Sequence, residues 1–177
     1  MFEVKEEKNN GLLCTIIKNN ATGEYVSIVP EFGANVNDLV LKKGEELISI
    51  LDGNQNKYQF TGKNIFKGAK LFPFVNRIKN GSYYFDDKRY QLDINYPEEG
   101  NAAHGIVYNI QFVSANRIID RSCAKALFKL EYDGSISGFP FAFDLELIYM
   151  LDIIQGFSCE TIVTNTSLNN FPFSDGW

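Results

Sequence analysis

Histidine and cysteine are scarce in this chain of 177 residues, and their scarcity restricts its chemistry. The only histidine is His104, and the three cysteines, Cys14, Cys123 and Cys159, lie far apart in the sequence. They provide neither metal-ligand spacing nor a CxxC pair, so we expect no metal site. An odd number of cysteines within apolar runs favours buried, reduced thiols, and a reducing cytoplasm is the expected compartment.

Long apolar runs and basic patches are missing as well. No run approaches the roughly 18 apolar residues of a membrane span, and the charged segment 1–8 has no apolar core of a signal peptide. The formal net charge is −5, without a dense Lys/Arg patch. We therefore expect neither a membrane nor a nucleic acid as a partner. The sequence also lacks a Gly-rich phosphate loop before a helix and a nucleophile elbow.

Residues that suit pleated sheets are abundant, and they alternate with polar residues. Hydrophobic residues make up 45% of the chain and aromatic residues 14%, enough for one domain with a sizeable core. The clearest strand is 143–151, where the odd-numbered residues are apolar and Asp144 and Glu146 point the other way. Residues 126–132 form a similar stripe. Further strands are expected over Leu12–Lys18, Tyr25–Val29, Val36–Leu41, Ile48–Leu51, Phe112–Ile119 and Phe157–Asn165.

One tight hairpin is expected where Ser82–Phe85 and Lys88–Leu92 flank Asp86-Asp87, because aspartate tolerates the positive φ of such turns better than most residues. Residues 53–62 and 96–105 have no periodic pattern and are expected to be loops. Many short strands separated by polar turns predict an all-β sandwich. No linker or internal repeat divides the chain.

His104 is the one side chain whose unperturbed pKa, about 6.5, suits proton transfer near neutral pH. A lone histidine more often has a structural hydrogen-bonding role, and that alternative stays open at this point. Arg77 lies in the apolar segment Pro73-Phe-Val-Asn-Arg-Ile78, where a buried guanidinium must be paired or must face a ligand. Its planar fork can hydrogen-bond two adjacent hydroxyls, as in many sugar sites. An internal salt bridge explains it equally well.

Four motifs together resemble the aldose 1-epimerase (galactose mutarotase) family. Residues 71–92 resemble its Pro-Phe-x-Asn-Arg-Ile segment followed by Gly-x-(aromatic)-x-Phe-Asp-Gly-Lys-x-Tyr-x-Leu, with Asp87 in place of the turn glycine. Asn101-Ala-Ala-His-Gly105 resembles Asn-x-Leu-His-Gly, and residues 138–149 resemble its Tyr/Phe-Pro strand. Residues 165–177 resemble Asn-x-Thr/Ser…Gly-x-His-Pro-Tyr-Phe. Order and spacing agree from about residue 25 onward.

The resemblance implies a large β-sandwich, the galactose mutarotase-like supersandwich, with an open sugar-binding face. Its reaction interconverts the α and β anomers of an aldohexose. A base removes the anomeric hydroxyl proton and an acid protonates the ring oxygen, without metal or cofactor. By resemblance, Arg77 and Asn76 bind the substrate, Arg77 through the sugar hydroxyls, and His104 is the first catalytic histidine, near the ring oxygen.

The resemblance also implies that the chain is the N-terminal part of such a sandwich. The family's second histidine would follow Trp177, and its sugar-binding aspartate and general-base glutamate would lie further on. We therefore expect residues 1–177 to be a single partial domain that is inactive by itself. Such a chain is expected to self-associate through surfaces that the other part would cover.

Three alternatives remain open. A hexose-6-phosphate 1-epimerase would need a cationic pocket, for which Lys70, Lys79, Lys88 and Arg89 are the nearest candidates. The chain could instead be a non-catalytic half-length protein that binds sugar or a partner. A purely structural β module ranks last, because it leaves the motifs around Arg77 and His104 without a reason.

Overall fold

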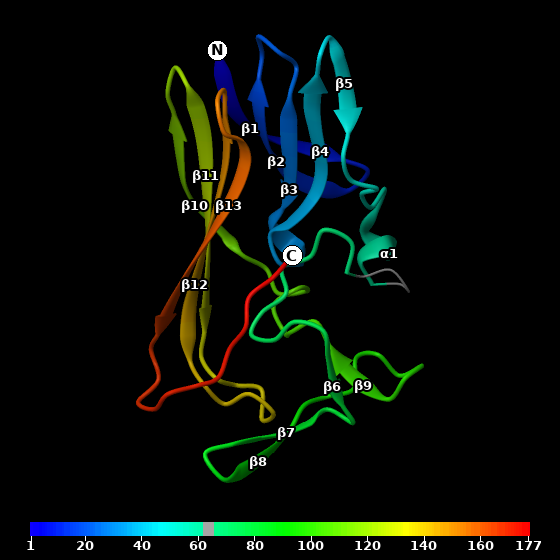
Figure 1. Ribbon diagram of the computed structural model, residues 1–177, viewed down its shortest axis with the longest axis vertical. Helices are drawn as coiled ribbons and strands as arrows, with labels where there is room; N and C mark the ends of the chain where they lie inside the picture. The colour runs from blue at the N-terminus through cyan, green and yellow to red at the C-terminus, as the bar shows by residue number, and fades with distance from the viewer. Residues whose placement is uncertain (62–65) are drawn as a thin grey trace.

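Two antiparallel sheets contain most of the chain (Figure 1). The structure, a computed structural model, describes residues 1–61 and 66–177. One sheet has the strand order β1-β2-β3-β4-β5 and the other β10-β11-β12-β13, and two small sheets pair β6 with β9 and β7 with β8. The strands are β1 (Phe2–Asn9), β2 (Leu12–Asn19), β3 (Tyr25–Val29), β4 (Asn35–Lys43), β5 (Glu46–Ser49), β6 (Arg77–Lys79), β7 (Ser82–Phe85), β8 (Lys88–Gln91), β9 (Asn101–Ala103), β10 (Val113–Ile119), β11 (Cys123–Tyr132), β12 (Phe143–Asp152) and β13 (Gly156–Asn165). The short helices are η1 (Pro30–Phe32) and α1 (Lys57–Phe60).

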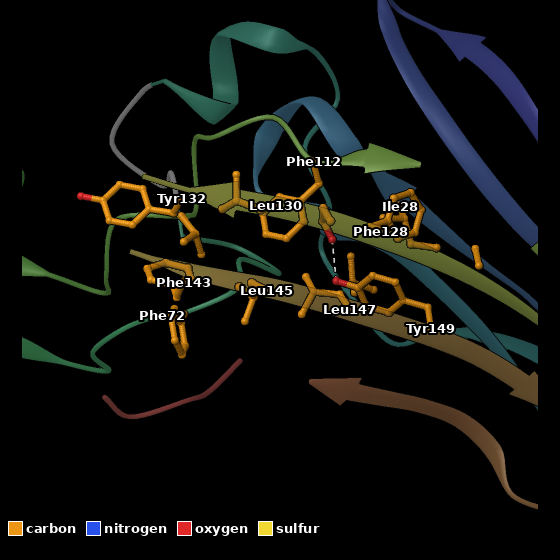
Figure 2. Close-up of a cluster of buried hydrophobic side chains, with 14 of the residues drawn as sticks. Ile28, Phe72, Phe112, Phe128, Leu130, Tyr132, Phe143, Leu145, Leu147 and Tyr149 are labelled. Carbon is orange, nitrogen blue, oxygen red and sulfur yellow. Dashed lines mark hydrogen bonds between the residues drawn. The ribbon is translucent and has the colours of Figure 1, made fainter. Parts of the chain in front are cut away.

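The core lies between the two large sheets, and its centre is the alternating stripe predicted over residues 143–151. Every second residue of β12 is buried, and β11 shows the same alternation (Figure 2). These side chains share one cluster with Ile17, Val26 and Ile28 of the first sheet. The buried Tyr149 hydroxyl donates to the carbonyl oxygen of Ala34 at 2.6 Å, which links β12 to the start of β4. The predicted all-β fold is confirmed.

The Asp-Asp hairpin is confirmed. β7 and β8 pair from Ser82↔Gln91 to Phe85↔Lys88. Asp86 and Asp87 have φ angles of 49° and 58°, the left-handed conformation that a two-residue hairpin turn of this type requires. This hairpin lies at the far end of the molecule from β5, beside the small β6–β9 sheet (Figure 1).

Several predicted boundaries are wrong, always at exposed or very short elements. β5 spans Glu46–Ser49 rather than 48–51, because all four of its residues are exposed at a sheet edge and show no alternation. β1 was not predicted, since this edge strand is highly charged. The predicted loops contain α1 and β9, of three or four residues each, too short for a period to be visible. Gly62, at the end of the first loop, lies outside the described residues.

The cysteines are less buried than predicted. All three are free thiols, but only Cys14 is buried, while Cys123 and Cys159 are half-buried. Burial raises the pKa of the Cys159 thiol to about 12, so this thiol is protonated at neutral pH. Among the described residues, no helix has the length and apolar character needed to cross a bilayer.

Candidate functional site

The site is built around one central backbone segment, Leu71–Phe72. On one side, Leu71 pairs antiparallel with Gly176 through two hydrogen bonds of 3.0 and 3.1 Å. On the other side, Phe72 pairs in parallel with Gly105. The C-terminal segment returns from the end of β13 to the centre of the molecule (red in Figure 1) to make this contact. The C-terminal residues and the residues after β9 therefore flank the same backbone.

Strands β6 and β9 place the three candidate site residues next to one another. β6 begins at Arg77, which pairs with Ala103, the last residue of β9. His104 follows directly, and its backbone N–H donates to the carbonyl oxygen of Asn76 at 2.9 Å. Asn76 and His104 have φ angles of 61° and 63°, which turn the chain sharply at both positions. The structure thus groups Asn76, Arg77 and His104, whereas their roles remain predictions.

The residue after His104 must be glycine for this arrangement. Gly105 has a φ of 85°, and a Cβ at this position would lie 2.1 Å from the carbonyl oxygen of Phe72 and 2.6 Å from its nitrogen. A collision with backbone cannot be relieved by rotating a side chain. The glycine of the Asn-Ala-Ala-His-Gly motif therefore permits the close approach that fixes the position of His104.

Arg77 is exposed, contrary to the burial that its apolar surroundings in the sequence indicated. The reason is that β6 is only three residues long and belongs to a small sheet at the surface. The Arg77 Nε lies 2.7 Å from Glu99 Oε2, and one terminal nitrogen donates to Asn76 Oδ1 at 3.2 Å. Its guanidinium carbon lies 5.3 Å from the centre of the Tyr96 ring. These contacts orient the guanidinium at an open surface, where an ion pair itself adds little stability.

His104 is half-buried, and its ring packs edge-on against Phe66, with 4.6 Å between ring centres. Burial lowers the pKa of His104, and the positive charge of Arg77 lowers it further. The imidazole is therefore mainly neutral at pH 7. Its Nδ1 is buried and has no hydrogen-bond partner among the described residues. An unpaired buried nitrogen costs about 1–3 kcal/mol, so this ring is a poor structural hydrogen-bonding residue.

Glu99, Tyr96 and Phe66 were not recognised from the sequence. Glu99 and Tyr96 lie in a stretch without periodicity, and Phe66 directly follows the residues that the structure does not describe. No local sequence pattern identifies them, because the folding of the chain brings them into contact with Arg77 and His104. The only available signal was the proximity of Tyr96 and Glu99 in sequence to the Asn-Ala-Ala-His-Gly motif, and Phe66 had none.

The cationic pocket considered for a sugar phosphate is not formed as expected. The Lys70 side chain is fully buried and paired with Asp175, so it cannot line an open phosphate pocket. Arg89 lies in the β7–β8 hairpin, where its Nε donates to Ser82 Oγ at 2.8 Å. A phosphate pocket that includes Lys70 is therefore wrong.

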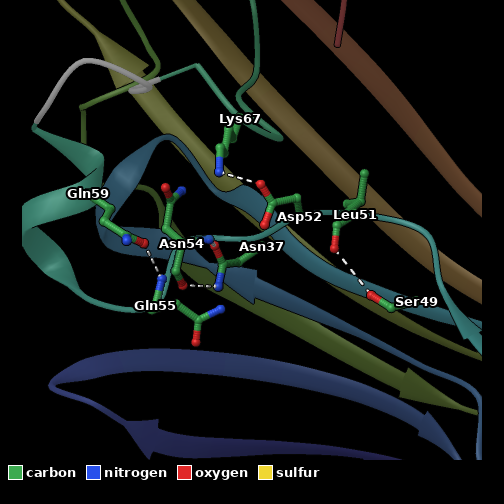
Figure 3. A network of polar contacts seen from close by, with 8 residues as sticks. All are labelled: Asn37, Ser49, Leu51, Asp52, Asn54, Gln55, Gln59 and Lys67. Carbon is green, nitrogen blue, oxygen red and sulfur yellow. Dashed lines mark hydrogen bonds and ion pairs between the residues drawn. The ribbon is translucent and has the colours of Figure 1, made fainter.

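A cleft of about 570 Å³ lies elsewhere, on the face of the first sheet. It contains none of the three grouped residues. Figure 3 shows one wall, where Asn37 and Asn54 exchange hydrogen bonds of 2.7 and 2.9 Å and Lys67 pairs with Asp52 at 2.6 Å. The Asn37–Asn54 bonds fasten the chain after β5 onto β4, and the Lys67–Asp52 pair joins that chain to residue 67; both are structural roles. Within residues 1–61 and 66–177, no three His, Cys, Asp or Glu side chains are placed to hold a metal ion.

The fold is the galactose mutarotase-like fold. A galactose mutarotase-like protein from Clostridium acetobutylicum superposes with a TM-score of 0.78 at 26% identity, over 94% of this chain and 50% of that one. A GalM/aldose epimerase homologue from Caenorhabditis elegans superposes with a TM-score of 0.70 at 18% identity, over 94% and 47%. The chain therefore spans about half the length of these solved structures.

The sequence relationship is equally plain. The profile of the family described as aldose 1-epimerase matches residues 16–177, and the chain belongs to this family. The bifunctional protein GAL10 of Kluyveromyces lactis is 38% identical over 72 residues, which is 41% of this chain and 10% of that protein. The uncharacterized protein YihR of Escherichia coli K12 is 26% identical over 160 residues, 88% of this chain and 47% of that protein.

Proposed function

We propose that this chain contributes the Asn76–Arg77–His104 part of an aldose 1-epimerase site, in an isomerase that interconverts the anomers of an aldohexose. The observation that carries the proposal is the hydrogen bond from His104 N–H to the Asn76 carbonyl oxygen. It brings the His104 backbone against the residue before Arg77, close enough for the charge of Arg77 to act on the half-buried imidazole. Family membership supports the reaction class and the resemblance suggests the roles, while the grouping of the three residues supports their acting together.

In this proposal Arg77 binds the sugar. Its planar fork presents parallel N–H donors that match two neighbouring hydroxyl oxygens. Glu99 and the Asn76 side chain hold the fork in one orientation, so little conformational entropy is lost when the sugar binds. Asn76 offers a further amide to the same hydroxyls.

His104 acts near the ring oxygen. In the reaction a base removes the proton of the anomeric hydroxyl (O1), the bond between the anomeric carbon (C1) and the ring oxygen (O5) breaks, and O5 receives a proton. The open-chain aldehyde then rotates about its bond to C2. The reverse steps close the ring and give the other anomer. A neutral imidazole at pH 7 can donate one hydrogen bond to O5 as charge develops there. A positioned proton donor or acceptor supplies about 10²- to 10⁴-fold in rate.

Sugar binding can be tested on this chain. Because His104 is the only histidine, its imidazole Hε1 gives a single, readily assigned NMR signal, which should shift when glucose or galactose is added. Arg77→Ala should weaken this response about tenfold or more, because charge-assisted hydrogen bonds are lost, while Arg89→Ala in the distant hairpin should not. An unresponsive His104 signal at saturating sugar would refute the proposal.

Catalysis is tested by polarimetry. The chain alone is expected to leave mutarotation at its spontaneous rate. In a form that also carries the half of the fold present in its relatives, His104→Ala should lower kcat about 10²-fold with little change in KM. Reduced stability with unchanged specific activity would instead assign His104 a structural role.

The hexose-6-phosphate alternative is separated by comparing the affinities for glucose and glucose 6-phosphate. Burial of Lys70 removes one of its four proposed cations, so we expect no preference for the phosphate. A non-catalytic sugar-binding protein would respond to sugar in the NMR titration but would gain no polarimetric activity in the longer form.

We further propose that the chain self-associates. β13 is a ten-residue strand at the edge of its sheet, with polar backbone groups available for another strand. Large apolar side chains are exposed on and after it, including Ile162, Leu168 and Phe173. A second copy of the chain that pairs along β13 would cover both features.

A further inference from the structure

Lys70 is a fully buried cation beside the candidate site. Its side chain has no exposed surface, and it directly precedes the Leu71–Phe72 segment. Burying an ammonium group is unfavourable unless it is paired and hydrogen-bonded. An apolar side chain would fill this space without the unfavourable free energy of burying a charge. A lysine at this position is therefore unexpected if its only role is to fill space.

Its partners come from β13 and from the C-terminal segment. The ammonium is paired with the Asp175 carboxylate and hydrogen-bonded to Thr161 Oγ1 at 2.7 Å. It also lies 4.5 Å from the centre of the Trp177 ring, within the range of a cation–π contact. These contacts fasten residues 175–177 to the start of the central segment, next to the Leu71↔Gly176 bridge.

Trp177 is held but not enclosed. Its ring packs edge-on against the buried Tyr149, with 5.4 Å between ring centres, while 46% of the residue remains exposed. The backbones around Gly176 and Gly105 lie on opposite sides of Leu71–Phe72, so they are two strand spacings, about 10 Å, apart. Trp177 directly follows Gly176, and a partly exposed indole suits the apolar C–H face of a pyranose, since aromatic rings commonly line ligand sites.

We propose that Lys70 is a positioning residue that fixes Trp177 as an aromatic wall of the sugar site. Its ammonium contacts the face of the indole ring, and its ion pair with Asp175 keeps the segment 175–177 bound to the Leu71–Phe72 segment. The sugar then lies between the indole and the Arg77–His104 group. This inference rests on the proposed sugar site and adds one wall of it.

The positioning can be tested without sugar, because Trp177 is the only tryptophan of the chain. Lys70→Met removes the charge at similar length. We expect its tryptophan emission to shift to longer wavelength and acrylamide to quench it more strongly, with an unchanged far-UV circular dichroism spectrum. Lys67→Met, which removes a lysine paired with Asp52 outside this segment, is the matched control and should leave both readouts unchanged.

A milder variant keeps the test decisive if Lys70→Met fails to fold. Thr161→Val removes only one acceptor of the ammonium and should shift emission and quenching in the same direction, by less. Thr164→Val, at an exposed position of the same strand, should have no effect. If Lys70→Met folds and its emission and quenching match the wild type, the positioning role is refuted. If only Thr161→Val folds, wild-type emission and quenching in that variant refute it.

A glucose titration then separates this inference from the proposed function. If both hold, sugar shifts the His104 NMR signal and changes the Trp177 emission, and Lys70→Met weakens binding. If the His104 signal shifts while Trp177 does not respond, the aromatic wall is refuted and the sugar site stands. If neither responds, the proposed function itself fails, and the wall with it.

Discussion

The charges of Arg77 and His104 are coupled at the scale of single residues. The guanidinium is one of the two causes that lower the pKa of His104, the larger being burial of the ring. Both causes favour the neutral imidazole beside a permanent positive charge.

Removing the charge of Arg77 should raise the pKa of His104. Arg77→Gln keeps a polar side chain but no longer repels the imidazolium, so His104 should bind its proton at higher pH. The pKa is read from the single histidine signal in an NMR titration. Arg89→Gln, in the β7–β8 hairpin, is the control and should leave the pKa unchanged; an unchanged or lower value in Arg77→Gln would contradict the coupling.

Stability should also depend on pH through His104. Its pKa in the folded chain is lowered, whereas in the unfolded chain it is about 6.5. Between these two values the unfolded state binds more protons, so the free energy of unfolding rises with pH through this window and is fully recovered above about pH 6.5. Urea denaturation at a series of pH values should show this rise in the wild type and lose it in His104→Gln. A free energy of unfolding that rises more steeply with pH in His104→Gln than in the wild type would disprove this dependence on His104.

At the scale of elements, the backbones of Phe72 and Gly105 approach so closely in the candidate site that no side chain fits between them. Gly105→Ala places a Cβ against the Phe72 backbone, so it should lower the free energy of unfolding by about 3 kcal/mol or more. Gly100→Ala is the matched control, since Gly100 also has positive φ but has nothing within 4 Å of the added Cβ. It should cost only the strain of the left-handed conformation, about 1–2 kcal/mol. Equal losses in urea denaturation would show that the close approach is not required.

The elements that sequence reasoning found are those with a local signal. β12 alternates because one of its faces lies in the core, and Asp86-Asp87 marks a turn because few residues adopt positive φ. β6 and β9 are three residues long, too short to show an alternating pattern. Their position depends on the positive φ of Asn76, which the hydrophobic periodicity of the sequence does not predict. The short length of β6 is also why the burial expected for Arg77 was wrong.

The site was predictable in part. The motifs identified Asn76, Arg77 and His104, which the structure places together. The Lys70–Asp175 pair could not be foreseen, because it joins residues far apart in the sequence. Sequence reasoning named Lys70 as one candidate for a phosphate pocket on charge alone, whereas burial decides what a charged residue can contact.

At the scale of the whole molecule, β13 lies at the edge of its sheet among the described residues, and the proposed self-association rests on this position. We expect sedimentation to show dimers or larger species that increase with concentration. Ile162→Lys, which places a charge on the edge strand, should shift the distribution toward monomer. Ile154→Lys, in the exposed turn between β12 and β13, should not. A stable, compact monomer at high concentration would refute self-association along β13.

The bridge between Leu71 and Gly176 has a consequence for the order of events during synthesis. Strands β1 to β5 each pair with their neighbour in sequence, so this sheet can form while the rest of the chain is still being translated. The central segment of the candidate site is translated early, but one of its flanking segments follows β13 and is translated only after both large sheets. Nascent chains therefore carry Lys70 and the Leu71–Phe72 segment before Asp175, Gly176 and Trp177 are available to pair with them.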